Sequence, residues 1–189
     1  MDLYQKTEQF VIDSFTKAGD ERGIKHFLRT VYWLEQLKPN ADEALKIAAV
    51  AHDIERAFRK QDYANVFNSE KGFASDEHLS YHQTEGAKII SEFLKKEGAD
   101  KKIVERVKML VEKHEIGGNE DQNLVKDADS VSFFENNANH FIEVKVKQTS
   151  KEKVKDKFDW MFNRITSDKA KELAKPWYEE GLHKLSLLD

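Results

Sequence analysis

The chain has 189 residues, of which 35% are charged and 39% hydrophobic, and its formal net charge is -4. It contains no cysteine, which excludes disulfides, thiolate metal sites and cysteine nucleophiles and fits a reducing compartment. The mildly acidic balance lacks the basic footprint of most duplex-binding proteins, so nucleic acid is not an expected partner. No apolar run reaches membrane-spanning length, and the first residues lack a signal-peptide pattern, so we expect a cytoplasmic protein with no membrane partner.

Apolar residues recur at helical spacing through most of the chain, and only two prolines and eight glycines interrupt them. This pattern predicts helices over residues 3–17, 21–38, 41–53, 78–96, 100–113, 123–136, 151–165 and 168–187. Residues 143–147 alternate in the manner of a strand, but a single strand would have no partner, so we expect a helix there too. The prediction is an all-α, single-domain helical bundle over residues 1–189.

The helical pattern fails between about residues 56 and 76, where aromatic side chains are scattered among polar ones. Unstructured segments of this length inside a compact domain are often functional. We expect a long loop with one helical turn, whose aromatic residues cover a site, stack on a base, or fill the core. These residues are Phe58, Tyr63, Phe67 and Phe73.

The most informative residues end the predicted helix over 41–53, where an alanine-rich run stops at His52 and Asp53. Burying such a polar pair is unfavourable unless a partner compensates for it. A divalent metal ion is such a partner, because imidazole and carboxylate both bind these ions. Neighbouring side chains on a helix point about 100° apart. His52 and Asp53 could therefore serve different parts of one site, or two neighbouring ions.

Other polar residues lie near the ends of predicted helices, where they could converge on one cavity of a helical bundle. His82 lies early in the predicted helix over 78–96. His114 follows directly after the next predicted helix, over 100–113. Two acidic residues, Asp127 and Asp129, lie near the start of the next helix, and spacing alone does not decide which of them is a ligand.

The order of these residues resembles the H…HD…H…H…D signature of binuclear members of the HD superfamily of metal-dependent phosphohydrolases. The matching positions are His26, His52, Asp53, His82, His114 and Asp129. The flanking sequence is also similar, because residues 127–131 match the family's D-A-D-x-apolar element, whose second acidic residue is the ligand. The resemblance covers about residues 20–136, and the C-terminal extension of about 140–189 carries no motif of the family.

The resemblance implies a site with two divalent ions. One ion is expected on His26, His52 and Asp129, and the other on His82 and His114, with Asp53 between them. Ligands that offer only nitrogen and oxygen suit Fe, Mn, Zn, Co or Ni. The implied activity is cleavage of a phosphoester or phosphoanhydride by a metal-activated hydroxide. The expected substrate and partner is a nucleotide or another small phosphorylated metabolite.

Three residues are expected to act in catalysis: Asp53, which would bridge the ions, and Arg29 and Arg56, which would offset charge on the phosphoryl oxygens. Arg29 lies one turn beyond His26 and therefore shares its helix face. Arg59 and Lys60 are further candidate cations, although Lys60 fits a solvent-facing charge better.

Several charged residues have two interpretations. Glu55, Glu115 and Asp127 could orient the imidazoles from outside the ligand set, or they could be surface carboxylates. The lysine-rich stretch 145–157 fits a solvated helix face, with attraction of an anionic substrate as the alternative.

Two other functions are compatible with the same residues. Some HD-fold proteins with the two extra histidines hold two iron ions and are oxygenases. A metal-bound sensor or scaffold without catalytic activity is the third interpretation, although a degenerate enzyme would usually have lost a ligand.

Overall fold

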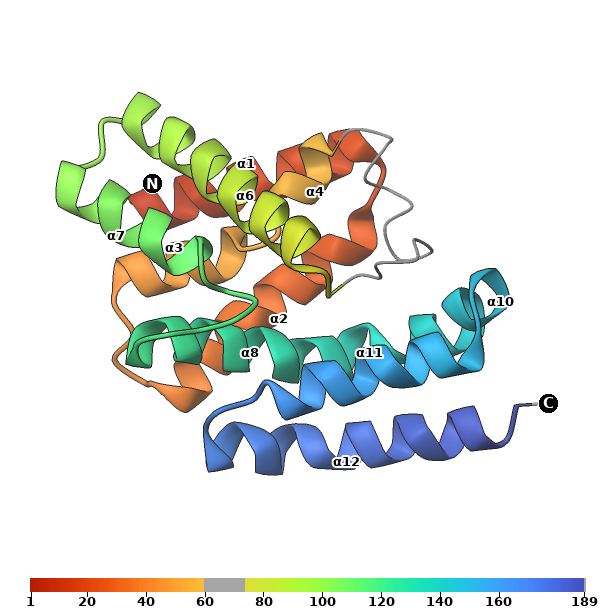
Figure 1. Cartoon of the computed structure of the whole chain (residues 1–189). Helices are drawn as coiled ribbons and strands as arrows, with labels where there is room; N and C mark the ends of the chain where they lie inside the picture. The colour runs from red at the N-terminus through yellow and green to blue at the C-terminus, as the bar shows by residue number, and fades with distance from the viewer. Residues whose placement is uncertain (60–73, 189) are drawn as a thin grey trace.

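The computed structural model describes residues 1–59 and 74–188, and over these residues it contains helices and no strands (Figure 1). The predicted all-α fold class is therefore confirmed. The candidate lid residues Tyr63, Phe67 and Phe73 and the candidate cation Lys60 lie outside the described residues. No described helix has both the length and the apolar character needed to cross a membrane.

The helices agree with the predicted ones to within a few residues. They are α1 (Leu3–Ala18), α2 (Glu21–Leu37), α3 (Glu43–Ala51), α4 (Glu55–Phe58), α6 (Asp76–Lys96), α7 (Lys101–Val111), α8 (Glu120–Asn136), α9 (Ala138–His140), α10 (Val146–Gln148), α11 (Lys151–Asn163) and α12 (Asp168–Ser186), with a π-helical turn over Phe141–Lys145 between α9 and α10. The turn over 141–145 agrees with the helix expected where the sequence alternates like a strand.

Side-chain caps set the helix starts and explain one error of the prediction. Asp42 caps α3 by accepting the N–H of Leu45 at 3.1 Å. Helix α8 begins three residues before the expected position 123, because Asn119 and Gln122 form a reciprocal capping box. A polar first turn has no apolar periodicity, so the pattern alone missed it.

Helix α3 lies at the centre of the bundle and contacts α1, α2, α7 and α8. Its alanines are buried, and their small side chains let four neighbouring helices approach closely. His52 and Asp53 follow its last residue directly, so they too lie deep in the molecule. The alanine-rich run therefore places the polar pair where polar groups need partners.

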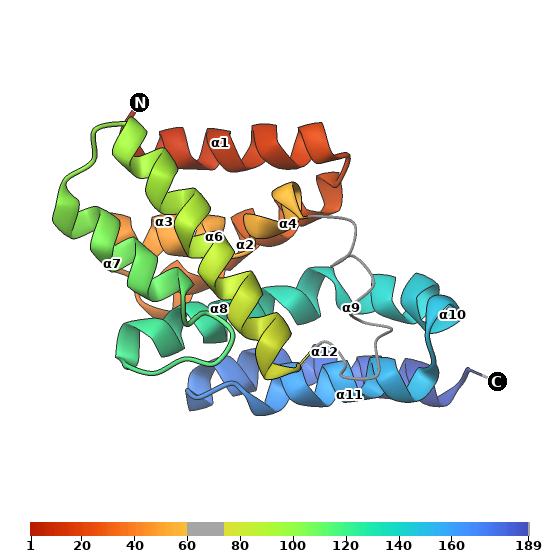
Figure 2. The same cartoon turned by 45° about the horizontal axis from the view of Figure 1, so that its top comes forward.

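The C-terminal helices α11 and α12 run along α8, on the side away from α1, α6 and α7 (Figures 1 and 2). Phe158 of α11 is fully buried, and its ring centroid lies 5.9 Å from those of Phe133 and Phe134 of α8. Gly181 of α12 permits this contact, because a Cβ there would lie 2.8 Å from the Phe158 ring. The extension thus shares one hydrophobic core with the rest of the chain.

Candidate metal centre

The structure brings together six side chains that are far apart in the sequence. They come from α2, from the turn after α3, from α6, from the turn after α7 and from α8, and all of them are buried. These residues are His26, His52, Asp53, His82, His114 and Asp129. The meeting of the helix ends follows from the central position of α3, which touches α2, α7 and α8.

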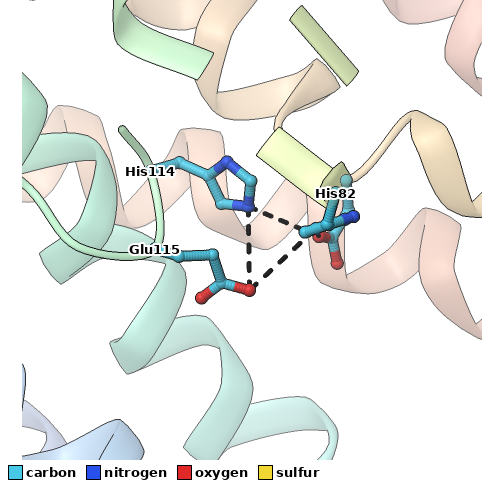
Figure 3. A group of neighbouring side chains, drawn as sticks. His82, His114 and Glu115 are labelled. Carbon is cyan, nitrogen blue, oxygen red and sulfur yellow. Dashed lines mark hydrogen bonds and ion pairs between the residues drawn. The ribbon is translucent and has the colours of Figure 1, made fainter. Parts of the chain in front are cut away.

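The cluster contains two groups whose donor atoms lie within 4.8 Å of one another. The first group combines His26, His52 and Asp53. The second combines Asp53 with His82, His114 and Glu115. Figure 3 shows the last three side chains pointing toward one another. Asp53 belongs to both groups and therefore stands between two possible ion positions.

The two carboxylate oxygens of Asp53 face different neighbours. Oδ1 lies 2.7 Å from Nε2 of His82 and 3.6 Å from Nε2 of His114. Oδ2 lies 2.9 Å from the Arg56 guanidinium and 3.8 Å from Nε2 of His52. Through its two oxygens, the carboxylate of Asp53 therefore reaches imidazoles of both groups.

Asp129 of α8 lies against the two histidines of the first group. Its Oδ1 lies 3.0 Å from Nε2 of His26 and 3.4 Å from Nε2 of His52. Its Oδ2 forms an ion pair with Arg164, which follows the last residue of α11. Asp127 faces elsewhere, because its carboxylate accepts the backbone N–H groups of Thr166 and Ser167 at 2.9 and 2.8 Å. The geometry thus favours Asp129 over Asp127 as the ligand and gives Asp127 a structural contact.

Two of the imidazoles are oriented by backbone carbonyls. Nδ1–H of His52 donates to the carbonyl of Ala49, and Nδ1–H of His114 donates to that of Val111, each at 2.8 Å. With the proton of a neutral imidazole held at Nδ1, the lone pair of Nε2 points into the cluster. Each of these histidines follows a helix, and a carbonyl in the last turn of that helix provides the acceptor.

His82 is oriented by a carboxylate instead. Its Nδ1–H donates to Oε2 of the buried Glu55 at 2.8 Å, and Arg59 donates to the same carboxylate at 2.7 Å. A carboxylate behind a histidine fixes its tautomer and raises its basicity as a ligand. Of the two interpretations of Glu55, its burial and its contact with His82 agree with the orienting one and not with a surface carboxylate. Arg59 supports Glu55 rather than lining the cluster.

The carboxylates of the cluster are ionised at neutral pH despite their burial. Burial alone would raise the pKa of Asp53 and Asp129, but Arg56 beside Asp53, Arg164 beside Asp129 and the imidazole of His52 hold both pKa values well below their usual range. Arg164 and His114 likewise outweigh burial and lower the pKa of Glu115 to about 2. The cluster thus concentrates negative charge in the protein interior.

Within the part of the chain that the structure describes, two buried imidazole nitrogens of the cluster lack a hydrogen-bond partner and are therefore free to bind a cation. Among the described residues, Nε2 of His52 and Nε2 of His114 are buried without a hydrogen-bond partner. Burial alone would lower the pKa of His52, but the negative Asp129 and Asp53 outweigh it and raise this pKa to about 9. A positive charge is therefore favoured at this position. Imidazole and carboxylate donors arranged in this way fit divalent transition metal ions.

A cavity of about 40 Å³ opens beside the cluster. Candidate ligands of the cluster form one side of it, and Phe133, Phe141 and Met161 contribute apolar surface. Arg56, which is exposed, and Lys157, which is half-buried, add positive groups. The interpretation of stretch 145–157 as a wholly solvated face is therefore wrong at Lys157, because α11 packs against the cluster.

Sequence reasoning missed some residues of the site and misplaced one. Glu115 was expected outside the ligand set, yet it belongs to the second donor group. Two further residues were not identified, because neither lies within the motif pattern: Arg164, and Ser132, whose hydroxyl lies 2.9 Å from Nδ1 of His26. Arg29 is directed away from the cluster, since it donates to Glu135 at 2.8 and 2.7 Å and lies over the Tyr32 ring. Its expected catalytic position is not supported by this geometry.

The fold and the cluster define an all-helical protein whose buried His, Asp and Glu side chains could hold metal ions. The chain belongs to a family described as a domain of unknown function (DUF4202), whose sequence model matches residues 13–184. This match includes the whole cluster and most of α12. No curated protein matches the chain, and no solved structure does so either.

Proposed function

We propose that this protein is an HD-type, metal-dependent phosphohydrolase that cleaves a phosphoester or phosphoanhydride of a nucleotide or another small phosphorylated metabolite. The observation that carries the proposal is the position of Asp53 between two donor groups. His26, His52 and Asp129 would hold one divalent ion, and His82, His114 and Glu115 the other, with Asp53 shared. When bound, two such ions lower the pKa of a water molecule and polarise a phosphoryl group.

The charges around the cluster support an anionic substrate. Three ionised carboxylates, those of Asp53, Glu115 and Asp129, face two guanidinium groups, those of Arg56 and Arg164. Two divalent cations would therefore give the site a net positive charge, which favours an anion such as a phosphate ester.

The cavity residues would position the phosphoryl group. Arg56 and Lys157 line the cavity together with the ligands, so their positive groups can contact phosphoryl oxygens. Burial lowers the pKa of Lys157 to about 8, so this side chain is still mostly protonated at neutral pH. A volume of about 40 Å³ holds a few water-sized groups, so the rest of a substrate would extend beyond the cavity.

A panel of substrates tests the proposal. Nucleotides, dinucleoside polyphosphates, cyclic dinucleotides and generic phosphoesters are incubated with the protein in the presence of Mn, Fe, Co or Ni, and the products are measured. We expect metal-dependent turnover of at least one class, abolished by Asp53→Asn and unaffected by His183→Ala on the exposed surface of α12. Oxygen consumption by the aerobically isolated, iron-loaded protein with no turnover of any phosphoester would contradict hydrolysis.

A further inference from the structure

Arg164 connects the C-terminal extension to the candidate metal centre. Its guanidinium forms ion pairs with Glu115, just after α7, and with Asp129 of α8. Nε–H donates to Oγ of Ser130 at 2.9 Å, and the group lies 4.6 Å from the ring centroid of Trp160. Only 7% of the side chain is exposed. The guanidinium is thus fixed by contacts on several sides.

The ion pairs divide the oxygens of both carboxylates in the same way. One oxygen of Asp129 faces His26 at 3.0 Å, and the other is bound by Arg164. One oxygen of Glu115 lies 3.9 Å from both His82 and His114, and the other is bound by Arg164. Each carboxylate therefore has one oxygen available on the side of the imidazoles.

We infer that Arg164 is a positioning residue that makes Glu115 and Asp129 one-oxygen ligands, one at each metal position. The inference rests on the metal-binding part of the proposed function. A carboxylate can bind an ion through one oxygen or through both. Binding through both would fill a position that a catalytic ion keeps open for water or substrate. Arg164 prevents this at both positions with a single rigid group.

The geometry of arginine suits this task better than that of lysine. A guanidinium is planar and presents several N–H donors in fixed directions, so it can bind two carboxylates at once. An ammonium is a point charge on a flexible stem and holds neither carboxylate in a set orientation. Arg164→Lys therefore keeps the charge but loses the constraint, which separates an electrostatic role from a positioning role.

Cobalt-substituted protein provides a test that does not depend on turnover. Co²⁺ per chain and the intensity of the visible d–d bands are measured for wild type, Arg164→Gln, Arg164→Lys and the control Arg106→Gln. Arg106 also bridges two carboxylates, those of Asp42 and Asp121 at 2.7 and 2.9 Å, but on the surface. Circular dichroism establishes that each variant is folded.

We expect both Arg164 variants to bind as much Co²⁺ as wild type but to show weaker d–d bands, because two-oxygen ligation raises the coordination number. Arg106→Gln keeps the wild-type spectrum. The inference is overturned if folded Arg164→Gln shows d–d bands as intense as those of wild type. If Arg164→Gln does not fold, bands of wild-type intensity in Arg164→Lys overturn it instead. Failure of wild type to bind Co²⁺ contradicts the metal site itself, whereas Co²⁺ binding with unchanged variant spectra contradicts only the role of Arg164.

Discussion

Ser132 binds both the ring and the backbone of His26, although the two residues are 106 positions apart. The hydroxyl donates its one proton to the carbonyl of His26 at 2.8 Å. It must therefore accept the N–H of Nδ1, which lies 2.9 Å away. This leaves Nε2 of a neutral His26 with a lone pair directed at Asp129, the arrangement expected of a metal ligand.

Replacing Ser132 tests this relationship. We expect Ser132→Ala to lower metal affinity about 10–100-fold, because histidines that lose their outer hydrogen bond lose orientation as ligands. Affinity is measured by competition with a chromophoric chelator. Ser91→Ala is the matched control, since Ser91 is buried and its hydroxyl donates to the carbonyl of Ala87 in its own helix, away from the cluster. Equal affinities of Ser132→Ala and wild type would contradict the role of Ser132.

Asp127 and Asp129 form a natural pair of variants, because they are two positions apart on α8 and have different partners. Asp127→Asn weakens the acceptor of the N–H groups of Thr166 and Ser167, so we expect it to lower the free energy of unfolding by about 1–3 kcal/mol. Its metal content stays at the wild-type value. Asp129→Asn is expected to reduce metal content. Urea unfolding of the metal-free proteins and elemental analysis provide the two measurements, and the reverse pattern would refute the assignment.

The two arginines expected to act in catalysis, Arg56 and Arg29, should differ in their effect on kcat. Arg56→Ala is expected to lower kcat about 10²–10³-fold, the typical effect of removing one group that stabilises transition-state charge. Arg29→Ala is expected to leave kcat unchanged and to lower the free energy of unfolding by about 1 kcal/mol or less, because its pair with Glu135 is partly exposed. Steady-state kinetics on the substrate found in the panel distinguish them. A loss of kcat in Arg29→Ala would restore the role expected from the sequence.

The sequence predicted the helices well, because apolar periodicity is a local pattern. The six residues named from the ordered motif lie together in one buried cluster. Apolar periodicity marks buried helix faces, and the His-Asp pair follows an unusually alanine-rich run. The contacts of Ser132 and Arg164 could not be predicted, because they join segments that meet only through packing of α2, α8 and α11. Glu115 was underestimated because α7 ends at Val111, before the predicted end at 113, and the turn that follows directs both His114 and Glu115 inward.

The buried carboxylate of Glu55 predicts how stability depends on pH in the metal-free protein. Burial alone would raise its pKa, but hydrogen bonds from His82 and Arg59 outweigh burial and lower it from 4.5 to about 2. Unfolded chains therefore take up this proton at a higher pH than the folded protein does. The contribution to stability is present above the unfolded pKa of 4.5 and is lost as the pH falls toward 2.

Urea unfolding of wild type and Glu55→Gln between about pH 5 and 3 measures this contribution. We expect the free energy of unfolding to fall less steeply with decreasing pH in the variant. The difference between the two slopes corresponds to the uptake of at most about one proton on unfolding. Glu112→Gln serves as the control, because Glu112 is paired with Lys108 outside the cluster. Parallel pH dependence in wild type and Glu55→Gln would show that Glu55 has no such linkage.

The most direct test of the central claim is the metal content of the purified protein and its histidine variants. We expect two transition metal ions per chain, one for each donor group. His82→Ala and His114→Ala should each reduce this to one ion, Asp53→Ala should lose both, and His183→Ala should keep both. One ion per wild-type chain that His82→Ala and His114→Ala leave in place would reduce the site to a mononuclear one, and a protein that binds no transition metal would contradict the account.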